Sequence, residues 1–351
     1  MSESEVRIYD HLDEDRLAGI LTAIRNIRIG IVGDVCLDIY WLADMTKSEL
    51  SRETPHFPLP VTEERVAPGA GGNVAANMAA LRPQKVFVVT LVGRDWRREL
   101  LLHELAKRAV DTRGVVASET RITNAYCKPM RKGFSDLQYE DPRIDFDNFR
   151  PPGEEDERHL LETLDKIAPD IDVLCVSDQY QYGCITGRVR EKIRDLARRG
   201  LLVVADSRNR IREFSEIILK PNEIEAFKAV RRKGDPRTAT LEEQAAIARE
   251  LAEMNQAKVC MTLGEKGCIY AERHNLVRIP AWKGEPPLDI CGAGDTFLAA
   301  FASALASGAE AWEAAFLGNL AAAVTIKKIN MTGTASPEEI AAKYRAVRKP
   351  A

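Results

Sequence analysis

The sequence has no surplus of basic residues and no long apolar run. It carries 50 Lys and Arg against 53 Asp and Glu, for a net charge of −3. A strong nucleic-acid binder usually has a basic surplus, so we expect no nucleic-acid partner. A membrane-spanning helix needs about 18 or more consecutive apolar residues, and no such run occurs, so we expect no membrane partner. Residues 1–5 lack the basic start and apolar stretch of a signal peptide, and we expect a cytoplasmic protein.

Paired cysteine motifs and linker-like segments are also missing. The seven cysteines are odd in number, none forms a CxxC pair, and several lie in apolar runs such as 173–176. This pattern predicts buried, reduced thiols and argues against a disulfide framework or a zinc site. Gly/Ser-rich linkers and repeats are absent, and 45% of the residues are hydrophobic. The 351 residues therefore favour one large domain over two domains joined by a linker.

Strand-like and helix-like segments alternate along most of the chain. Such alternation predicts an α/β fold, with a central, mostly parallel sheet covered by helices on both faces. The predicted strands are 27–34, 85–92, 171–177, 201–206, 216–219, 258–263 and 267–271. The predicted helices are 12–27, 73–82, 95–109, 155–167, 185–199, 222–230, 240–255, 295–307 and 310–327.

Two stretches interrupt this alternation. Residues 40–66 are polar and contain three prolines, which suits an excursion or an edge element better than a central strand. Residues 110–150 contain short strand-like pieces at 123–130 and 143–146, without a helical period. Together the two stretches predict a small β-lid on the main body. We therefore expect a single domain over 1–351 with an inserted lid.

Unusual residues follow several of the predicted strands. Ligands of parallel α/β sheets collect at the carboxyl ends of the strands, so these residues are candidates for a common site. They are Gly33 and Asp34, Ser177 and Asp178, 206–208, 220–222 and 262–264.

The most informative motif is Gly292-Ala293-Gly294-Asp295, which opens an apolar helix. Small residues let an anion approach the backbone closely, and the start of a helix offers free N–H groups. A carboxylate beside a phosphate site makes chemical sense as a general base that accepts a proton from an attacking hydroxyl. The alternative, weighed evenly on this motif alone, is that Asp295 is the N-cap of a core helix.

Three weaker motifs lie elsewhere in the chain. Residues 68–73 place glycines and Asn73 at a helix start, where they would hold a polar small molecule or form a flexible turn. Asn222 and Glu225 lie three residues apart on one helical turn, and would order Mg²⁺ or form an ordinary helix start. Residues 262–267 form a plain hairpin or the edge of a nucleotide site.

The order of these motifs resembles the ribokinase-like PfkB family of carbohydrate kinases, over residues 27 to 340. The resemblance implies a ribokinase-like fold and an ATP-dependent phosphorylation of a sugar hydroxyl, with the lid formed by about 40–66 and 121–146. Asp295 would be the catalytic base, and Gly292, Ala293 and Gly294 would supply an anion hole for the phosphoryl group. The other implied roles are sugar binding by Asp38, Asp34, Gly69, Asn73 and Arg143, ATP binding by Thr262, Gly264, Gly267 and Asn319, and Mg²⁺ ordering by Asn222 and Glu225.

Within this family the sequence is most similar to the heptose 7-phosphate kinases, in segments 33–38, 51–55 and 143–146. A sugar-phosphate substrate needs cations, and Arg suits a phosphate group. The resemblance also implies a homodimer joined through the lids. Family members often bind K⁺ through backbone carbonyls of the late loop, here those of Asp289 and Cys291. The available cations are Lys128, Arg131, Lys132, Arg143, Arg208 and Arg210.

Two departures from the family pattern keep other functions open. Ile290 and Cys291 stand where the family usually has small hydroxyl residues, and Ala70 replaces a common glycine. A kinase for another sugar, such as fructose or ribose, and a catalytically silent sugar or nucleotide sensor on the same fold are therefore alternatives. A nicotinamide-dependent dehydrogenase is disfavoured, because Val74 breaks the G-x-G-x-x-G pattern.

Overall fold

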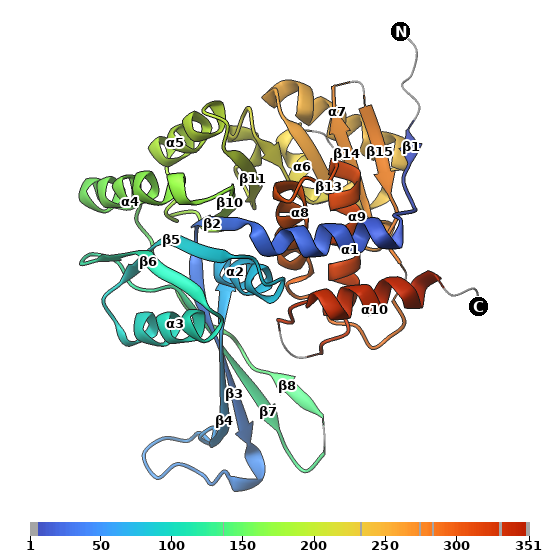
Figure 1. The fold of residues 1–351 in the computed structure, drawn as a ribbon. Coiled ribbons are helices and arrows are strands. Elements are labelled where there is room, and N and C mark those ends of the chain that lie inside the picture. Colours follow the sequence, from blue (N-terminus) through green and yellow to red (C-terminus); the bar gives the residue numbers. More distant parts are fainter. Residues whose placement is uncertain are drawn as a thin grey trace.

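The computed structural model describes residues 6–135, 137–231, 234–273, 275–282, 284–329 and 332–348. Its main sheet has ten strands in the order β1-β15-β14-β13-β12-β11-β10-β2-β5-β6 (Figure 1). Neighbouring strands pair in parallel except at β13–β14 and β14–β15. The strands are β1 (Arg7–Ile8), β2 (Arg28–Gly33), β5 (Lys85–Gly93), β6 (Val110–Ser118), β10 (Val173–Asp178), β11 (Leu202–Ser207), β12 (Ile218–Leu219), β13 (Lys258–Thr262), β14 (Cys268–Glu272) and β15 (Asn275–Ile279).

Helices cover both faces of this sheet, and the buried apolar side chains form two clusters separated by it. Alternate residues of one strand enter different clusters, as Ile31 and Val32 of β2 do, because successive strand side chains point to opposite faces. The first cluster includes residues of α1 (Glu14–Ala23), α2 (Gly71–Ala80), α3 (Trp96–Lys107), α8 (Ala293–Ala306), α9 (Ala311–Thr325) and α10 (Pro337–Arg348). The second includes residues of α4 (Glu154–Ile167), α5 (Gly187–Arg198), α6 (Glu223–Ala229) and α7 (Leu241–Asn255). The expected α/β class with a mostly parallel sheet is confirmed.

A second, smaller sheet extends away from the main body (Figure 1). We call this sheet the lid. Its central strand β3 lies between β4, which is antiparallel to it, and β7, which is parallel to it. β8 and β9 pair antiparallel to different parts of β7. Its strands are β3 (Val35–Asp44), β4 (Val61–Ala70), β7 (Ala125–Lys132), β8 (Gln138–Glu140) and β9 (Ile144–Phe146).

The structure corrects the sequence analysis at two places. Residues 110–118, grouped there with the lid, form β6 at the edge of the main sheet, because they pair in parallel with β5. Residues 35–39, expected to precede the lid, belong to strand β3, since it begins directly after Asp34.

The burial of the cysteines agrees in part with the expectation. Every cysteine is a free thiol, and six are buried, but Cys291 is exposed on the loop before α8. In the described part of the chain, no helix is long and apolar enough to cross a bilayer.

Candidate active site

The order in which the chain adds strands to the main sheet reverses between β2 and β10, which makes this position its switch point. From β2 the chain continues to β5 and β6 on one side, and from β10 to β11, β12 and β13 on the other. The carboxyl ends of strands beside such a switch point form a crevice that binds ligands. A hollow of about 320 Å³ lies at this edge. Its lining joins residues from four strand ends, helix α6 and the start of α8: Gln179, Asp206, Arg208, Lys220, Asn222, Ile224, Glu225, Lys228, Thr262, Gly294 and Asp295.

Asp295 lies in the first turn of α8, in the lining of this hollow. The N-cap interpretation is wrong, because Gly292 occupies the N-cap position with a φ of 77°. Burial raises the pKa of the Asp295 carboxyl to about 6, and the Asn73 side chain opposes this shift. Asn73 Nδ2 donates to Asp295 Oδ2 at 2.7 Å. The carboxylate can therefore accept a proton near neutral pH.

A chain of side-chain hydrogen bonds fixes this carboxylate between α2 and α8. Asn77 Nδ2 donates to the Asn73 carbonyl at 2.9 Å, and Thr296 Oγ1 donates to Asn77 Oδ1 at 2.8 Å. Asn73 and Asn77 are both buried. A Cβ atom on Gly292 would lie 2.8 Å from Asn73 Nδ2, so glycine is required for this approach. The two helix starts thus hold Asp295 in one position.

A lysine and two further carboxylates lie close to Asp295. Lys220 is buried, and its Nζ lies 2.9 Å from Asp206 Oδ2. Burial and the charge of Asp206 raise the pKa of Glu225 to about 7. Asn222 Oδ1 accepts from the Glu225 N–H, and Glu225 Oε2 accepts from the Asn222 N–H, both at 2.8 Å. This reciprocal capping box matches the helix-start alternative.

The same carboxylates fit a hydrated Mg²⁺ ion. Mg²⁺ prefers oxygen ligands and retains several waters, so it needs few direct protein ligands. Within the described residues, no three Asp, Glu, His or Cys side chains are arranged to hold a metal directly. Glu225, Asp206 and Asn222 would therefore act on the ion mainly through its waters.

Asp34 supports a loop and has no carboxylate oxygen free of backbone donors. Its oxygens accept from the N–H groups of Gln179, Tyr180 and Cys184, each at 2.8 Å. Burial raises its pKa to about 6. Asp34 was expected to bind the sugar. Its contacts instead position the loop that carries Gln179 into the hollow, and we interpret it as a positioning residue.

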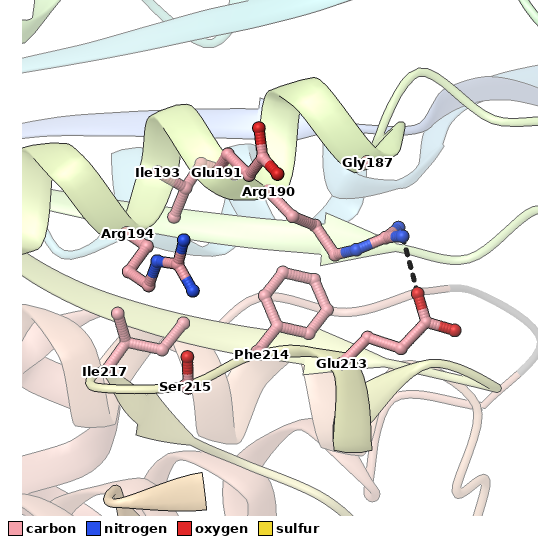
Figure 2. A pocket seen from close by; sticks show the side chains of 9 residues that line it. All are labelled: Gly187, Arg190, Glu191, Ile193, Arg194, Glu213, Phe214, Ser215 and Ile217. Atoms are coloured by element: carbon pink, nitrogen blue, oxygen red, sulfur yellow. Dashed lines mark ion pairs between the residues drawn. The ribbon is translucent and has the colours of Figure 1, made fainter.

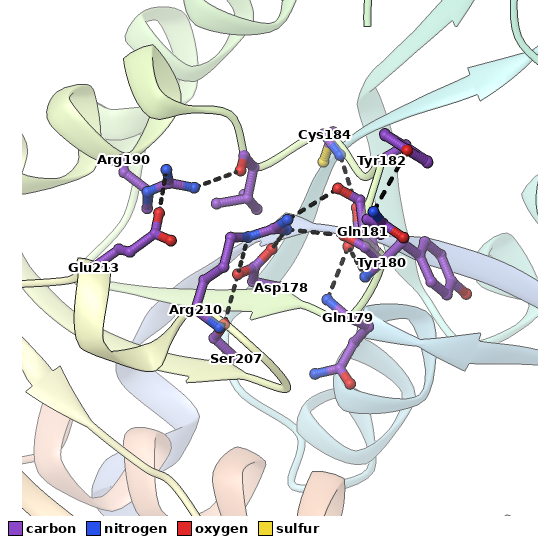
Figure 3. Close-up of polar contacts among 12 residues, drawn as sticks. Asp178, Gln179, Tyr180, Gln181, Tyr182, Cys184, Arg190, Ser207, Arg210 and Glu213 are labelled. Carbon is purple, nitrogen blue, oxygen red and sulfur yellow. Dashed lines mark hydrogen bonds and ion pairs between the residues drawn. The ribbon is translucent and has the colours of Figure 1, made fainter. Parts of the chain in front are cut away.

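Arg210 holds the other side of this loop (Figure 3). Its guanidinium pairs with the buried Asp178 and donates to the carbonyls of Tyr180 at 2.8 Å and Gln181 at 3.0 Å. Ser207 Oγ also donates to Asp178, at 2.6 Å. Arg210 was a candidate phosphate ligand, but these contacts occupy it.

The lid contributes a polar cluster around Asp38. Lys128 Nζ lies 3.5 Å from Asp38 Oδ1 and donates to Tyr40 Oη at 2.9 Å. A Cβ atom on Gly69 would lie 2.8 Å from Asp38 Oδ2, so this glycine leaves room for the carboxylate. Arg143 pairs with Asp145, with both N–O distances at 2.6 Å. The charge of Arg143 also acts against the raised pKa of Asp38, so Asp38, Gly69 and Arg143 lie near one another; their binding of a sugar stays a prediction.

The expected nucleotide residues lie near the β13–β14 turn. Thr262 ends β13, and Gly264 and Gly267 bracket a short 3-10 turn with φ of 56° and 92°. The two strands pair antiparallel, so the segment is a hairpin turn, and its role at a nucleotide stays a prediction. Asn319 is buried, and its Nδ2 donates to the carbonyls of Ile279 and Pro280, both at 3.2 Å. Its amide donor therefore already has partners.

The loop before α8 contains the expected K⁺ residues. Asp289 Oδ1 accepts from the Cys291 N–H at 3.0 Å, which closes a tight turn. Asp289 N–H donates to the Ile326 carbonyl at 2.9 Å. The K⁺ site stays a prediction.

Another hollow, of about 270 Å³, lies between α5 and residues 213–217 (Figure 2). Its lining includes Arg190, which pairs with Glu213, and the ring of Phe214. The lining includes no residue of α8 or of the lid. The hollow at the strand ends is therefore the candidate active site.

Comparison with known proteins agrees with this geometry. The model of the family described as "pfkB family carbohydrate kinase" matches residues 31–339. The chain belongs to the pfkB family of carbohydrate kinases. Two curated relatives are the bifunctional protein HldE of Hyphomonas neptunium, 32% identical over 336 residues, and that of Geobacter sulfurreducens, 30% identical over 316 residues. These matches cover 93% and 88% of this chain but only 65% and 61% of the relatives.

Solved structures share the pfkB fold at low sequence identity. The phosphofructokinase-2 of Escherichia coli, in complex with substrates and products, has a TM-score of 0.71 and 20% identity, covering 92% of this chain and all of that one. The ribokinase of Arabidopsis thaliana, complexed with ribose and ATP, has a TM-score of 0.68 and 19% identity, covering 91% and 98%. The ribokinase-like fold and the assignment as a carbohydrate kinase are thus confirmed.

Two residues that line the hollow, Lys220 and Gln179, had no specific role in the sequence analysis, although Lys220 was among the strand-end candidates. Lys220 received no role, although it follows an apolar strand and precedes the Pro-Asn-x-x-Glu segment. A lysine in such a position needs an acidic partner, which was a usable signal. No sequence pattern marks Gln179, because its place in the hollow depends on the loop that Asp34 holds through backbone hydrogen bonds.

Proposed function

We propose that this pfkB kinase transfers the γ-phosphoryl group of ATP directly, in line, to a hydroxyl of a sugar phosphate, and that Asp295 is the base. The observation that carries the proposal is the partly buried Asp295, held by Asn73 at 2.7 Å, with a pKa raised to about 6. At neutral pH this carboxylate is ionised but basic enough to accept the proton of an attacking hydroxyl.

The neighbouring groups would stabilise the phosphoryl group and place ATP. The N–H groups of Gly292 and Gly294 would face the charge that develops on the transferring group, whereas the expected Ala293 N–H already donates to the Ile290 carbonyl at 3.2 Å. Thr262, Gly264 and Gly267 would line the ATP phosphates and ribose, with Asn319 near the adenine. A bound Mg²⁺ ion would supply positive charge that offsets the charge of the ATP phosphates. Asn222 and Glu225 would hold its waters.

We propose a heptose 7-phosphate as the acceptor. The support is the similarity to the HldE proteins over most of this chain, together with the cations beside Asp38. Asp38, Gly69 and Asn73 would contact the sugar hydroxyls, and the lid would exclude water, which competes as an acceptor.

We also propose a homodimer joined through the lid. The face of the lid opposite Asp38 carries an apolar hollow of about 310 Å³, lined by Trp41, Ala43, Leu59, Val61, Pro129 and Ile144. Apolar hollows of this kind are typical of contact surfaces. Sedimentation velocity of the wild type and of Ile144→Glu tests this: the wild type is expected to sediment as a dimer and the variant as a monomer.

ADP release from ATP and Mg²⁺ over a panel of acceptors tests the proposed function. The panel contains heptose 7-phosphate, fructose, fructose 6-phosphate, ribose and nucleosides, each assayed with the wild type and with Asp295→Asn. Turnover of heptose 7-phosphate that the substitution abolishes is the expected result. Turnover of neutral sugars alone would overturn the heptose assignment. Ligand binding without ADP release from any acceptor would favour a silent sensor.

A further inference from the structure

The two faces of the lid differ sharply in chemistry. In strand β3 the side chains of Asp38 and Tyr40 alternate with those of Ile39 and Trp41, so the two sets point to opposite faces. Asp38 is in register with Tyr126 of β7, and Tyr40 with Lys128. Tyr126 is in turn in register with Asp145 of β9. One face of the lid therefore collects polar side chains around Asp38.

Two cations lie within this polar face. Lys128 Nζ lies 4.5 Å from the centroid of the Tyr40 ring. The Arg143 guanidinium lies 4.3 Å from the centroid of the Tyr126 ring. Aromatic faces hold both cations in place, which reduces the freedom they would lose on binding a ligand.

Both cations keep donors for a ligand. Arg143 uses Nε and one Nη2 hydrogen on Asp145, so both hydrogens of Nη1 and one of Nη2 are left. Lys128 has three N–H groups, of which one bonds Tyr40 Oη and one points to Asp38 at 3.5 Å. The Tyr180 ring lies edge-on to that of Tyr126, with the ring centroids 6.2 Å apart.

We infer that Lys128 and Arg143 bind a phosphate group that the acceptor sugar already carries. The inference rests on the proposed function, and it names the residues that would select a phosphorylated acceptor sugar. The hydroxyl that reacts must lie at Asp295, and the existing phosphate of a heptose 7-phosphate is at the far end of the sugar. Its binding site must therefore be separate from the catalytic hollow, as the polar face of the lid is.

Three of the other candidate cations are placed for different roles. Arg131 lies on the same strand as Lys128 but three residues on, and pairs with Asp141 at 2.8 Å. Arg210 is occupied by Asp178 and two carbonyls. Arg208 lines the catalytic hollow, where it would meet ATP. A neutral sugar needs no cation pair beside Asp38, because hydroxyl groups are satisfied by neutral or acidic partners.

Acceptor kinetics of Lys128→Met and Arg143→Met test the inference. Each substitution removes one or two charge-assisted hydrogen bonds, so KM for heptose 7-phosphate is expected to rise about 10- to 100-fold with kcat nearly kept. KM for the same heptose without its phosphate is expected to change less than about threefold. Lys128→Arg and Arg143→Lys, which keep the charge, are expected to restore much of the loss. The matched control is Arg131→Met, which removes a cation from the same strand.

The acceptor pair separates this inference from a general effect on Asp38. Equal losses for both acceptors would mean that Lys128 acts only through Asp38, and would overturn the phosphate site. Unchanged KM for heptose 7-phosphate in folded variants would overturn it too, while leaving the proposed function intact. If the wild type used only neutral sugars, both the phosphate site and the heptose assignment would fail, although loss of ADP release in Asp295→Asn would still support the kinase mechanism.

Discussion

Replacing Asp295 with asparagine is expected to abolish phosphoryl transfer and, at neutral pH, to stabilise the fold. Burial raises the pKa of this carboxyl from 3.8 to about 6. A carboxyl with a higher pKa in the folded than in the unfolded state destabilises the fold when it is ionised. The cost is absent below pH 3.8, grows as the pH rises toward 6, and is constant above that.

The magnitude follows from the shift. About two pKa units correspond to roughly 3 kcal/mol at most, since each unit is about 1.4 kcal/mol. Asp295 is only partly buried, so solvent screening reduces this to about 1–2 kcal/mol. Asparagine keeps the size of the side chain but cannot accept the proton, and the loss of activity is expected to be at least about 100-fold.

Urea unfolding at pH 4 and pH 8, together with ADP release, measures both effects. The variant is expected to gain stability over the wild type at pH 8 but little at pH 4. Glu191→Gln, an exposed change on α5, is the control and is expected to change neither. Full turnover in Asp295→Asn would refute the role of the base. An equal stability difference at both pH values would refute the burial cost.

Three further substitutions test the surroundings of Asp295. Asn73→Ala removes a donor to the carboxylate and is expected to raise its pKa by about one unit, so the acid limb of the kcat/KM profile moves to higher pH; an unmoved limb would contradict the pairing. Gly292→Ala places a Cβ 2.8 Å from Asn73 Nδ2 at a φ of 77°, and kcat is expected to fall about tenfold or more; unchanged kcat would show that the loop tolerates the clash. Ala70 has a φ of 51°, so Ala70→Gly is expected to stabilise the fold by about 1 kcal/mol in thermal unfolding; a lower melting temperature would mean that the turn is not strained.

Much of the fold is predictable because the hydrophobic periods are strong. The buried runs of β10 and β11 and the amphipathic α4 and α5 lie within one or two residues of their predicted bounds. Strands β1 and β15 were missed, since they are short and show little alternation of apolar and polar residues. Helix α10 was also missed, although Ser336, Pro337 and two acidic residues are typical helix-start signals.

The strand ends were predictable as a group, and the roles within the group were not. Alternation placed Asp206, Asn222 and Thr262 at one edge of the sheet, and they line one hollow. The sequence cannot tell which cations are free, because this depends on partners that are distant in the chain. Arg210 pairs with Asp178, 32 residues earlier, and also donates to the carbonyls of Tyr180 and Gln181.

Asp34 and Asp295 show how such roles can be separated. Both follow glycines, both are candidate ligands, and burial raises the pKa of each to about 6. Asp34 accepts three backbone N–H groups, so its oxygens are committed to the loop that they organise. For Asp295 the described residues supply one donor, Asn73, on Oδ2 only. A partly buried carboxylate with an oxygen that lacks a donor has a solvation cost that a structural role would not require, which supports the proposal of Asp295 as the base and of Asp34 as support for the site.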